Sequence, residues 1–298
     1  MKYRVTHITR YQYSKNVTLC HNVAHLLPRT TQQQTCAISE LKISPMPTNT
    51  SEWTDIFGNR QASFSIEKPH TELVVSATSE VEVVTASSLI DAAFPISWEK
   101  AVEHIKTSSD PETIETRMYV LESEFIEFSE EIKNYSQKSF SPDRPLLEAV
   151  EDLMHRIFKE FKYDPHFSSI ATPLEEVLKH RKGVCQDFAH LAIACLRMQG
   201  LAARYVSGYL ETIPPKGKKR LVGADASHAW FSVYVPHLGW VDFDPTNAKI
   251  PDEQHITVAW GRDYADVAPL KGIVFGGGDK NILEVSVDVE RFSYEDPL

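Results

Sequence analysis

Alternating apolar and polar positions dominate the first part of the chain. The stretch YRVTHITRYQY places Tyr3, Val5 and His7 on one side of an extended backbone. Further segments of strand length, rich in β-branched residues and separated by turn-forming stretches such as PMPTNT and FGNR, follow at residues 36–45, 62–68 and 72–84. Several short strands with turns between them predict an N-terminal antiparallel β-sandwich domain over residues 1–87.

Helical spacing replaces the alternation from residue 88 onward. The stretches WEKAVEHIKTSS and YVLESEFIEFSEEIKNYSQ have helical periodicity with acidic faces, and prolines punctuate the region at positions 95, 111 and 142. Residues 88–139 are therefore predicted to form a helical connector. A strong amphipathic helix follows, because apolar side chains recur at steps of three and four, at Leu146, Val150, Leu153, Ile157 and Phe161.

A second helix is predicted from about Cys185 to Met198, with Gly200 after its end. Its predicted buried face consists of Phe188, Leu191, Ala192, Cys195 and Leu196. Strand-like stretches come next, namely ARYVSGYLE, AWFSVYV and GWVDFDP, and one more lies in the tail GDKNILEVSVDVERF. Helices followed by antiparallel strands indicate an α+β domain over residues 140–298.

Composition and charge narrow the class of protein. The chain has 298 residues, enough for two modest domains, with 42% hydrophobic and 24% charged residues. A net charge of −10 disfavours nucleic acid as a partner. No apolar run approaches the length of a membrane span, and the N-terminus lacks the apolar core of a signal peptide. Four cysteines outside CxxC pairs favour a reducing, cytoplasmic location.

Cys185 stands where a helix is predicted to begin. The unpaired N–H groups at a helix N-terminus stabilise a thiolate, and they can also hold the oxyanion that forms on an attacked carbonyl. Gly183, just before it, would let a substrate approach the backbone. The alternative is a small buried hydrophobe, and this interpretation is kept for Cys20, Cys36 and Cys195.

Among the twelve histidines, His228 is the best candidate for a base. It opens the strand SHAWFSVYV, and GWVDFDPT follows and ends in the acid Asp244. A hairpin pivoting near Pro236 would place position 228 opposite position 244, although a shift of one or two residues stays open. A carboxylate there can bind one imidazole nitrogen while the other faces a thiol. Asp242 has the same parity and is the rival acid, but Asp244 is favoured at the rim of the strand.

Two stretches, GVCQDFAHLAIACLRMQGLAARYVSGY and SHAWFSVYVPHLGWVDFDPTN, resemble the transglutaminase-like superfamily in its bacterial form. The nucleophile of that family stands in G-x-C-x-D/E, its histidine in H-A-W and its aspartate in D-P-T, which match Cys185, His228 and Asp244 in the same order. The stretches YRVTHITRYQYSKNV and HLLPR resemble the β-rich N-terminal region of bacterial members, and AWGRDYADVAPLKGIVFGGG the segment after D-P-T. The resemblance implies a cysteine-protease-like α+β core.

The resemblance also implies acyl transfer through a thiol, with no metal and no cofactor. Cys185 would attack an amide carbonyl, His228 would move the proton, and Asp244 would orient the imidazole. The backbone N–H of Cys185 is one candidate oxyanion donor. Tyr163 is a candidate for the second, with a packed tyrosine as the alternative. Gln186 and Asp187 are expected to support the site, with simple helix capping as the alternative for Asp187.

Three alternatives stay open at this point. The acyl group can pass to water, as in a peptidase or amidase acting on a peptide or protein amide, or to an amine, as in protein cross-linking. Hydrolysis is favoured, since the sequence contains no evident calcium loop such as DxDxDG and bacterial relatives resemble peptidases. A non-catalytic binding or assembly module is the second alternative. Metal binding by Cys185, Cys195 and His228 is the third, and it is disfavoured because the two cysteines lie about 280° apart around the helix. The substrate and the oligomeric state stay open.

Overall fold

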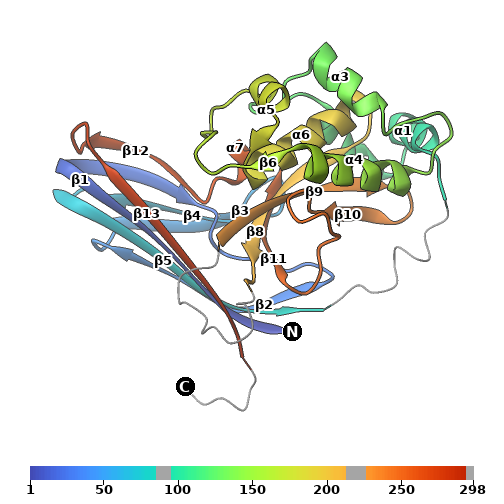
Figure 1. The fold of residues 1–298 in the computed structure, drawn as a ribbon. Helices are drawn as coiled ribbons and strands as arrows, with labels where there is room; N and C mark the ends of the chain where they lie inside the picture. The colour runs from blue at the N-terminus through green and yellow to red at the C-terminus, as the bar shows by residue number, and fades with distance from the viewer. Residues whose placement is uncertain (85–94, 213–225, 293–298) are drawn as a thin grey trace, which may run out of the picture.

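The computed structural model describes residues 1–84, 95–212 and 226–292. A long antiparallel sheet stands beside a second unit in which helices cover one face of a smaller sheet (Figure 1). The α+β class predicted from the sequence is confirmed. The first residues of the predicted connector, 88–94, lie outside the described ranges.

The N-terminal sheet is organised around one long strand, β1 (Lys2–Ala24). Its neighbours are β2 (Gln34–Ser44), β3 (Asn49–Thr54), β4 (Arg60–Ile66) and β5 (His70–Val83), in the order β2-β5-β1-β4-β3. The first half of β1 pairs with β5 and its last residues pair with β4, both antiparallel. The alternation at the start of the sequence is the burial pattern of β1, in which Tyr3, Val5 and His7 point inward.

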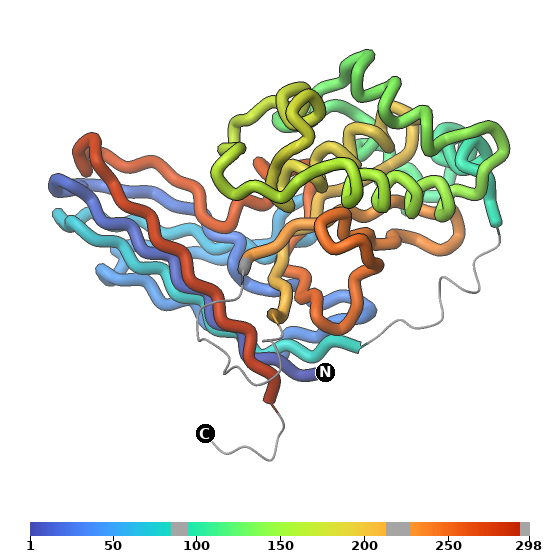
Figure 2. The backbone as a smooth tube through the Cα atoms, in the orientation of Figure 1, coloured from blue at the N-terminus to red at the C-terminus, as the bar shows by residue number. Residues whose placement is uncertain are grey.

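The two last strands of the chain also belong to this sheet. β12 (Leu270–Gly276) and β13 (Ile282–Arg291) pair with β1, the latter from Tyr3↔Arg291 to Gln12↔Ile282. Figure 2 shows the red C-terminal segment running beside the blue N-terminal one. The sequence analysis grouped these residues with the catalytic domain, because alternation identifies a strand but does not identify its partner.

The connector is helical in pieces. Its elements are α1 (Trp98–Thr107), α2 (Pro111–Thr116), the 3₁₀ turn η1 (Arg117–Val120) and α3 (Glu130–Gln137). The helical pattern proposed for YVLESEFIEFSEEIKNYSQ is wrong for residues 121–129, where an isolated bridge joins Ser123 and Ile126. Ile126 is fully buried there. The apolar spacing of this stretch therefore reflects packing of an irregular segment against the core.

The second unit is built around α6 (Cys185–Met198), which begins and ends as predicted. It packs on a four-stranded antiparallel sheet of order β10-β9-β8-β11, formed by β8 (Ala203–Leu210), β9 (Ala226–Val235), β10 (Gly239–Phe243) and β11 (His255–Gly261). α4 (Leu146–Glu160) and α5 (Leu174–His180) also contact α6, which buries it from Asp187 to Arg197 rather than on one face alone. α7 (Tyr264–Val267) follows β11.

This arrangement holds the start of α6 at the edge of the unit. A short parallel pair, β6 (Lys162–Tyr163) and β7 (Lys182–Gly183), leads into α6 and places Tyr163 opposite Gly183.

None of the helices within the described ranges is both long and apolar enough to cross a bilayer.

Candidate active site

Cys185 is the first residue of α6, and its side chain is partly exposed. The helix starts here because Asp187, in its first turn, accepts a hydrogen bond from the backbone N–H of Val184 at 2.7 Å. Ser168 Oγ donates to the same carboxylate oxygen. The first N–H groups of the helix have no intrahelical acceptor, so the thiol lies beside the positive end of the helix dipole.

Gly183 leaves the space that this cap occupies. A Cβ at position 183 would lie 2.8 Å from both Cβ and Oδ2 of Asp187, closer than packed atoms allow. Burial raises the pKa of Asp187, while its hydrogen bonds to Ser168 and Val184 lower it. The contacts of Asp187 are therefore those of a helix cap, the alternative that the sequence left open for this residue.

Tyr163 and Gln186 lie around the same helix start. The Tyr163 side chain is about half exposed, with its ring against Phe188. Burial raises the pKa of Tyr163, and the charges of Cys185 and Asp187 raise it further. Gln186 is partly buried, and its side chain forms no hydrogen bond with the residues that the structure describes.

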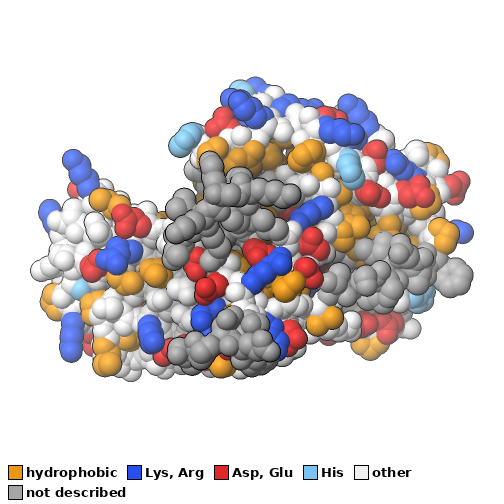
Figure 3. Space-filling view, turned by 60° about the horizontal axis from the view of Figure 1, so that its bottom comes forward, with side chains coloured by type: hydrophobic (Ala, Val, Ile, Leu, Met, Phe, Trp, Pro, Cys, Tyr) orange, Lys and Arg blue, Asp and Glu red, His pale blue; other side chains and the backbone are white. Residues whose placement is uncertain are grey.

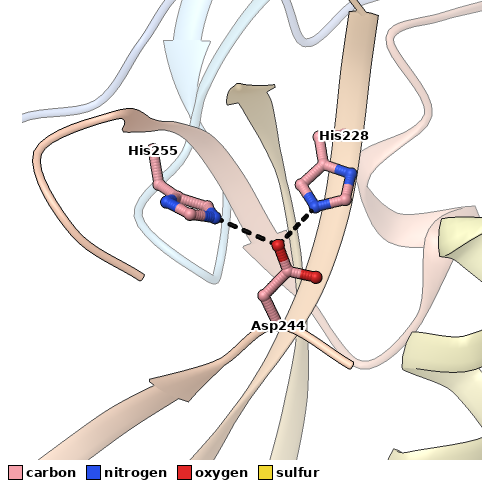
Figure 4. Close-up of side chains that lie close together, drawn as sticks. All are labelled: His228, Asp244 and His255. Carbon is pink, nitrogen blue, oxygen red and sulfur yellow. Dashed lines mark hydrogen bonds and ion pairs between the residues drawn. The ribbon is translucent and has the colours of Figure 1, made fainter. Parts of the chain in front are cut away.

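His228 and Asp244 meet in a buried hydrogen bond. The Nε2 atom of His228 lies 2.8 Å from Oδ2 of Asp244 (Figure 4), and the two residues are 8% and 0% exposed. Asp244 directly follows β10, and the turn after it folds back so that the N–H groups of Thr246 and Asn247 donate to Oδ1 at 2.9 and 3.2 Å. The backbone of its own turn therefore orients the carboxylate, independently of the side chains that contact it.

The hairpin register differs by two residues from the one centred on Pro236. β9 and β10 pair as Gly239↔Val235 through Phe243↔Phe231, so the pivot lies at residue 237. The backbone allows this because His237 and Gly239 adopt φ values of 67° and 90° in the turn. His228 reaches Asp244 as a diagonal neighbour, within the range that the sequence analysis left open.

Asp242, the rival acid, is committed elsewhere. It pairs with Ser232 across the strands, accepts a hydrogen bond from Trp230 Nε1 at 3.0 Å, and also accepts one from Ser232 Oγ. The acid that bonds His228 is Asp244.

The Cys185 side chain is the second group that acts on the charge of His228. Burial alone would lower the pKa of His228, but hydrogen bonds to Asp244 and to the Cys185 side chain, with the charges of both groups, raise it to about 10. The His228, His255 and Asn247 side chains hold the pKa of the Asp244 carboxyl far below its usual range against the opposing effect of burial. Because Nε2 is bonded to Asp244, Nδ1 is the imidazole nitrogen left for the thiol. His228 thus bonds the Asp244 carboxylate and interacts electrostatically with the Cys185 side chain.

His255 is a member of this group that the sequence analysis missed. Its Nε2 atom lies 3.1 Å from the same Oδ2 of Asp244, and Asn247 Nδ2 donates to that oxygen at 2.7 Å. His255 opens β11, the stretch HITVAWG, which was not recognised as a strand. The available signal was a polar residue at the head of an alternating, β-branched run shortly after D-P-T.

The same three side chains offer potential metal ligands. One ligand atom each from His228, Asp244 and His255 lies within 4.8 Å of the others. Both Nε2 atoms approach one carboxylate oxygen, which requires a proton on each nitrogen, and a metal ion would have to displace both protons. The set Cys185, Cys195 and His228 is not brought together, since Cys195 is fully buried in the hydrophobic core.

Comparisons with known proteins identify the family to which the chain is similar. The family model for the bacterial transglutaminase-like N-terminal region matches residues 3–82, and the model for the transglutaminase-like superfamily matches residues 133–245. The uncharacterised protein Rv2569c of Mycobacterium tuberculosis is 41% identical over 98% of this chain and 93% of its own length. A protein-glutamine gamma-glutamyltransferase of Pseudomonas aeruginosa is 28% identical over 42% of this chain and 20% of its own.

One solved structure has the same fold along the whole chain. The crystal structure of a candidate cysteine protease from Cytophaga hutchinsonii superposes with a TM-score of 0.72, covering 97% of this chain and 98% of that one at 19% identity. The two family matches cover both the N-terminal sheet and the unit that holds Cys185, His228 and Asp244. The protein belongs to the transglutaminase-like superfamily and carries the bacterial transglutaminase-like N-terminal region.

Proposed function

We propose that the protein is a thiol-dependent acyl-transfer enzyme that cleaves an amide bond in a peptide or protein. The observation that carries this proposal is the buried His228–Asp244 pair, whose imidazole interacts electrostatically with the partly exposed Cys185 thiol at the start of α6. A non-catalytic binding module would not need a buried ion pair beside an accessible thiol, because burying such a pair costs free energy that folding alone does not recover.

In the acylation step, the Cys185 thiolate attacks the amide carbonyl and a carbon–sulfur bond forms. The carbon–nitrogen bond then breaks, and the imidazolium of His228 gives its Nδ1 proton to the departing amine. Asp244 keeps the imidazole oriented and stabilises its charged form. The backbone N–H of Cys185 and the Tyr163 hydroxyl are the proposed donors to the oxyanion.

In the deacylation step, water attacks the thioester and His228 takes one of its protons, which restores the thiolate and the imidazolium and releases a carboxylic acid that loses its proton to the solvent. An amine in place of water would give a new amide, the reaction named for the Pseudomonas aeruginosa relative. We propose hydrolysis as the main outcome. The net charge of −10, and a surface on which acidic and basic side chains are interspersed on the face shown in Figure 3, favour a peptide over a nucleic acid.

A substrate panel with a competing amine tests both the proposed amide cleavage and the proposed preference for hydrolysis over transfer. Purified protein is incubated with peptide, isopeptide and glutamine-amide substrates, with and without an excess of a primary amine, and the products are identified by mass spectrometry. Hydrolysis predicts a free carboxylate whose yield changes little when amine is added. A dominant amine adduct would instead make the protein a transferase, and the absence of any product together with a slow thiol would favour a binding module.

The pH dependence provides a second check, and its unfolding measurement needs no knowledge of the substrate's identity. Because the folded pKa of His228 is raised from 6.5 to about 10, protonated His228 stabilises the fold fully below pH 6.5, and this stabilisation is lost as the pH rises through about 10. The imidazolium needed to protonate the leaving amine persists over the same range. We expect kcat/KM to fall near pH 10 rather than near 6.5, and the free energy of unfolding in urea to decline between those values. The variant His228→Gln should lack this component of the decline.

A further inference from the structure

His255 touches the candidate site without touching the thiol. It lies at the first position of β11, 4% exposed, with its Nε2 atom directed at Oδ2 of Asp244, the oxygen that His228 also contacts (Figure 4). Its ring packs edge-on against Trp230, with centroids 5.3 Å apart. The ring is therefore held in place by packing, and it presents one nitrogen to the carboxylate.

The hydrogen bonds of Nδ1, the other nitrogen of His255, determine whether Nε2 carries a proton in its contact with Asp244. The backbone N–H of Asp252 donates to Nδ1 at 3.3 Å, which leaves the proton of a neutral ring on Nε2. The Oδ1 atom of Asp252 also lies 3.3 Å from Nδ1 and would accept from it if the ring were charged. In both protonation states Nε2 carries a proton, so His255 is a donor to Asp244 whatever its charge.

β11 itself is held by the N-terminal domain. It is the edge strand of its sheet, paired with β8 on one side only. On the other side the Gln34 side-chain amide donates to Thr257 O at 2.7 Å and accepts from Thr257 N–H at 2.8 Å. The buried Asn59 amide does the same at Trp260, at 2.7 and 2.9 Å.

These two amides act as a substitute partner strand. A carboxamide has the donor and acceptor pattern of a peptide group, so each one closes the backbone groups that an edge strand leaves open. Gln34 begins β2 and Asn59 directly precedes β4, so both amides come from the N-terminal sheet. The strand that carries His255 is thereby joined to the N-terminal domain at two points.

We propose that His255 is a positioning residue that acts on the catalytic histidine through Asp244, and that the N-terminal domain sets its place by binding the edge of β11. The proposal rests on the proposed function of the Cys185 site. It gives the N-terminal domain a part in the chemistry, since a displaced β11 would withdraw one of three donors from Oδ2 of Asp244. The other titratable or charged groups around the ring are Asp252 and His228, with Lys249 bonded to Asp252.

The test is the rate at which iodoacetamide alkylates Cys185 in the full-length protein between pH 6 and 10.5, followed by peptide mass spectrometry. Wild type is expected to react at pH 7 within a few-fold of its rate at pH 10.5. His255→Phe, which keeps a ring but no donor, should react about 10- to 30-fold more slowly at pH 7 and equally fast at pH 10.5, where an ordinary thiol is also ionised. His255→Gln, which keeps an N–H near the Nε2 position, should recover most of the loss.

Controls separate positioning from loss of folding. His70→Phe removes another buried histidine, whose Nδ1 bonds Lys68 O in the N-terminal sheet, and it should leave the pH 7 rate unchanged. Gln34→Met removes the amide that bonds Thr257 of β11. It should slow alkylation of Cys185 at pH 7, as His255→Phe does, but by a smaller factor. Circular dichroism and thermal unfolding confirm that each variant is folded.

The outcomes distinguish the positioning role of His255 from the proposed function of the Cys185 site. A wild-type thiol that is slow at pH 7 overturns the proposed function. A fast wild type with an equally fast His255→Phe overturns the positioning role alone, as does a Gln variant no better than Phe. A Gln34→Met variant that reacts like wild type overturns the role given to the N-terminal domain. With a substrate from the panel, kcat should fall in His255→Phe while KM stays unchanged.

Discussion

Cys185→Ala is expected to abolish amide cleavage, with a loss on the order of 10⁴- to 10⁶-fold in kcat. The sulfur is the atom that bonds the acyl group, and neither water nor another side chain within the site can replace it. The thiol is partly exposed and packs at the margin of the hydrophobic core rather than inside it, so its removal should change the free energy of unfolding little. Kinetics on a substrate from the panel, with urea unfolding, measures both effects.

Cys195→Ala is the matched control for this prediction. It makes the same chemical change ten residues along the same helix, at a position that is fully buried. Burial raises the pKa of the Cys195 thiol to about 12, so it should resist alkylation at neutral pH. The control should lose stability, because a core cavity forms, and keep its activity. Comparable activity in the two variants would rule out Cys185 as the nucleophile.

The elements that sequence analysis recovered are those whose signal is local. α6 was delimited from residue 185 to 198 because its apolar spacing, the preceding Gly183 and the following Gly200 all lie within one short stretch. The strands of the β9–β10 hairpin were recovered for the same reason. Their register was not, because it depends on the φ values that His237 and Gly239 adopt in the turn.

The features that escaped prediction depend on contacts between distant segments. β13 alternates like any half-buried strand, and nothing in its residues indicates that it pairs with β1 some 280 positions earlier. His255 is only 11 residues from Asp244, but the contact requires β11 to cross to the far edge of the sheet beside β8. That placement is completed by Gln34 and Asn59, whose amides offer no sequence pattern of their own.

Asp244→Asn is expected to produce the second large loss, on the order of 10³- to 10⁴-fold in kcat/KM. Oδ2 accepts bonds from His228, His255 and Asn247, and Oδ1 accepts two backbone N–H groups. An asparagine has one oxygen and one NH₂ group, so in either orientation its NH₂ faces donors. His228 would also lose the anion that keeps it protonated, and the fall in activity should move from about pH 10 towards 6.5.

Asp242→Asn is the matched control, because it removes a nearby acid that does not bond His228. It removes the same charge two residues earlier, inside β10, where the carboxylate accepts bonds from Trp230 and Ser232. We expect a cost of about 1–3 kcal/mol in unfolding free energy but a thiol that reacts at pH 7 within a few-fold of wild type. Asp244→Asn should lose about 3–5 kcal/mol and the neutral reactivity together, because a buried ion pair is broken. If both variants lost stability equally and neither changed the reactivity of Cys185, Asp244 would be a structural acid, and the orientation of His228 would have to come from another group.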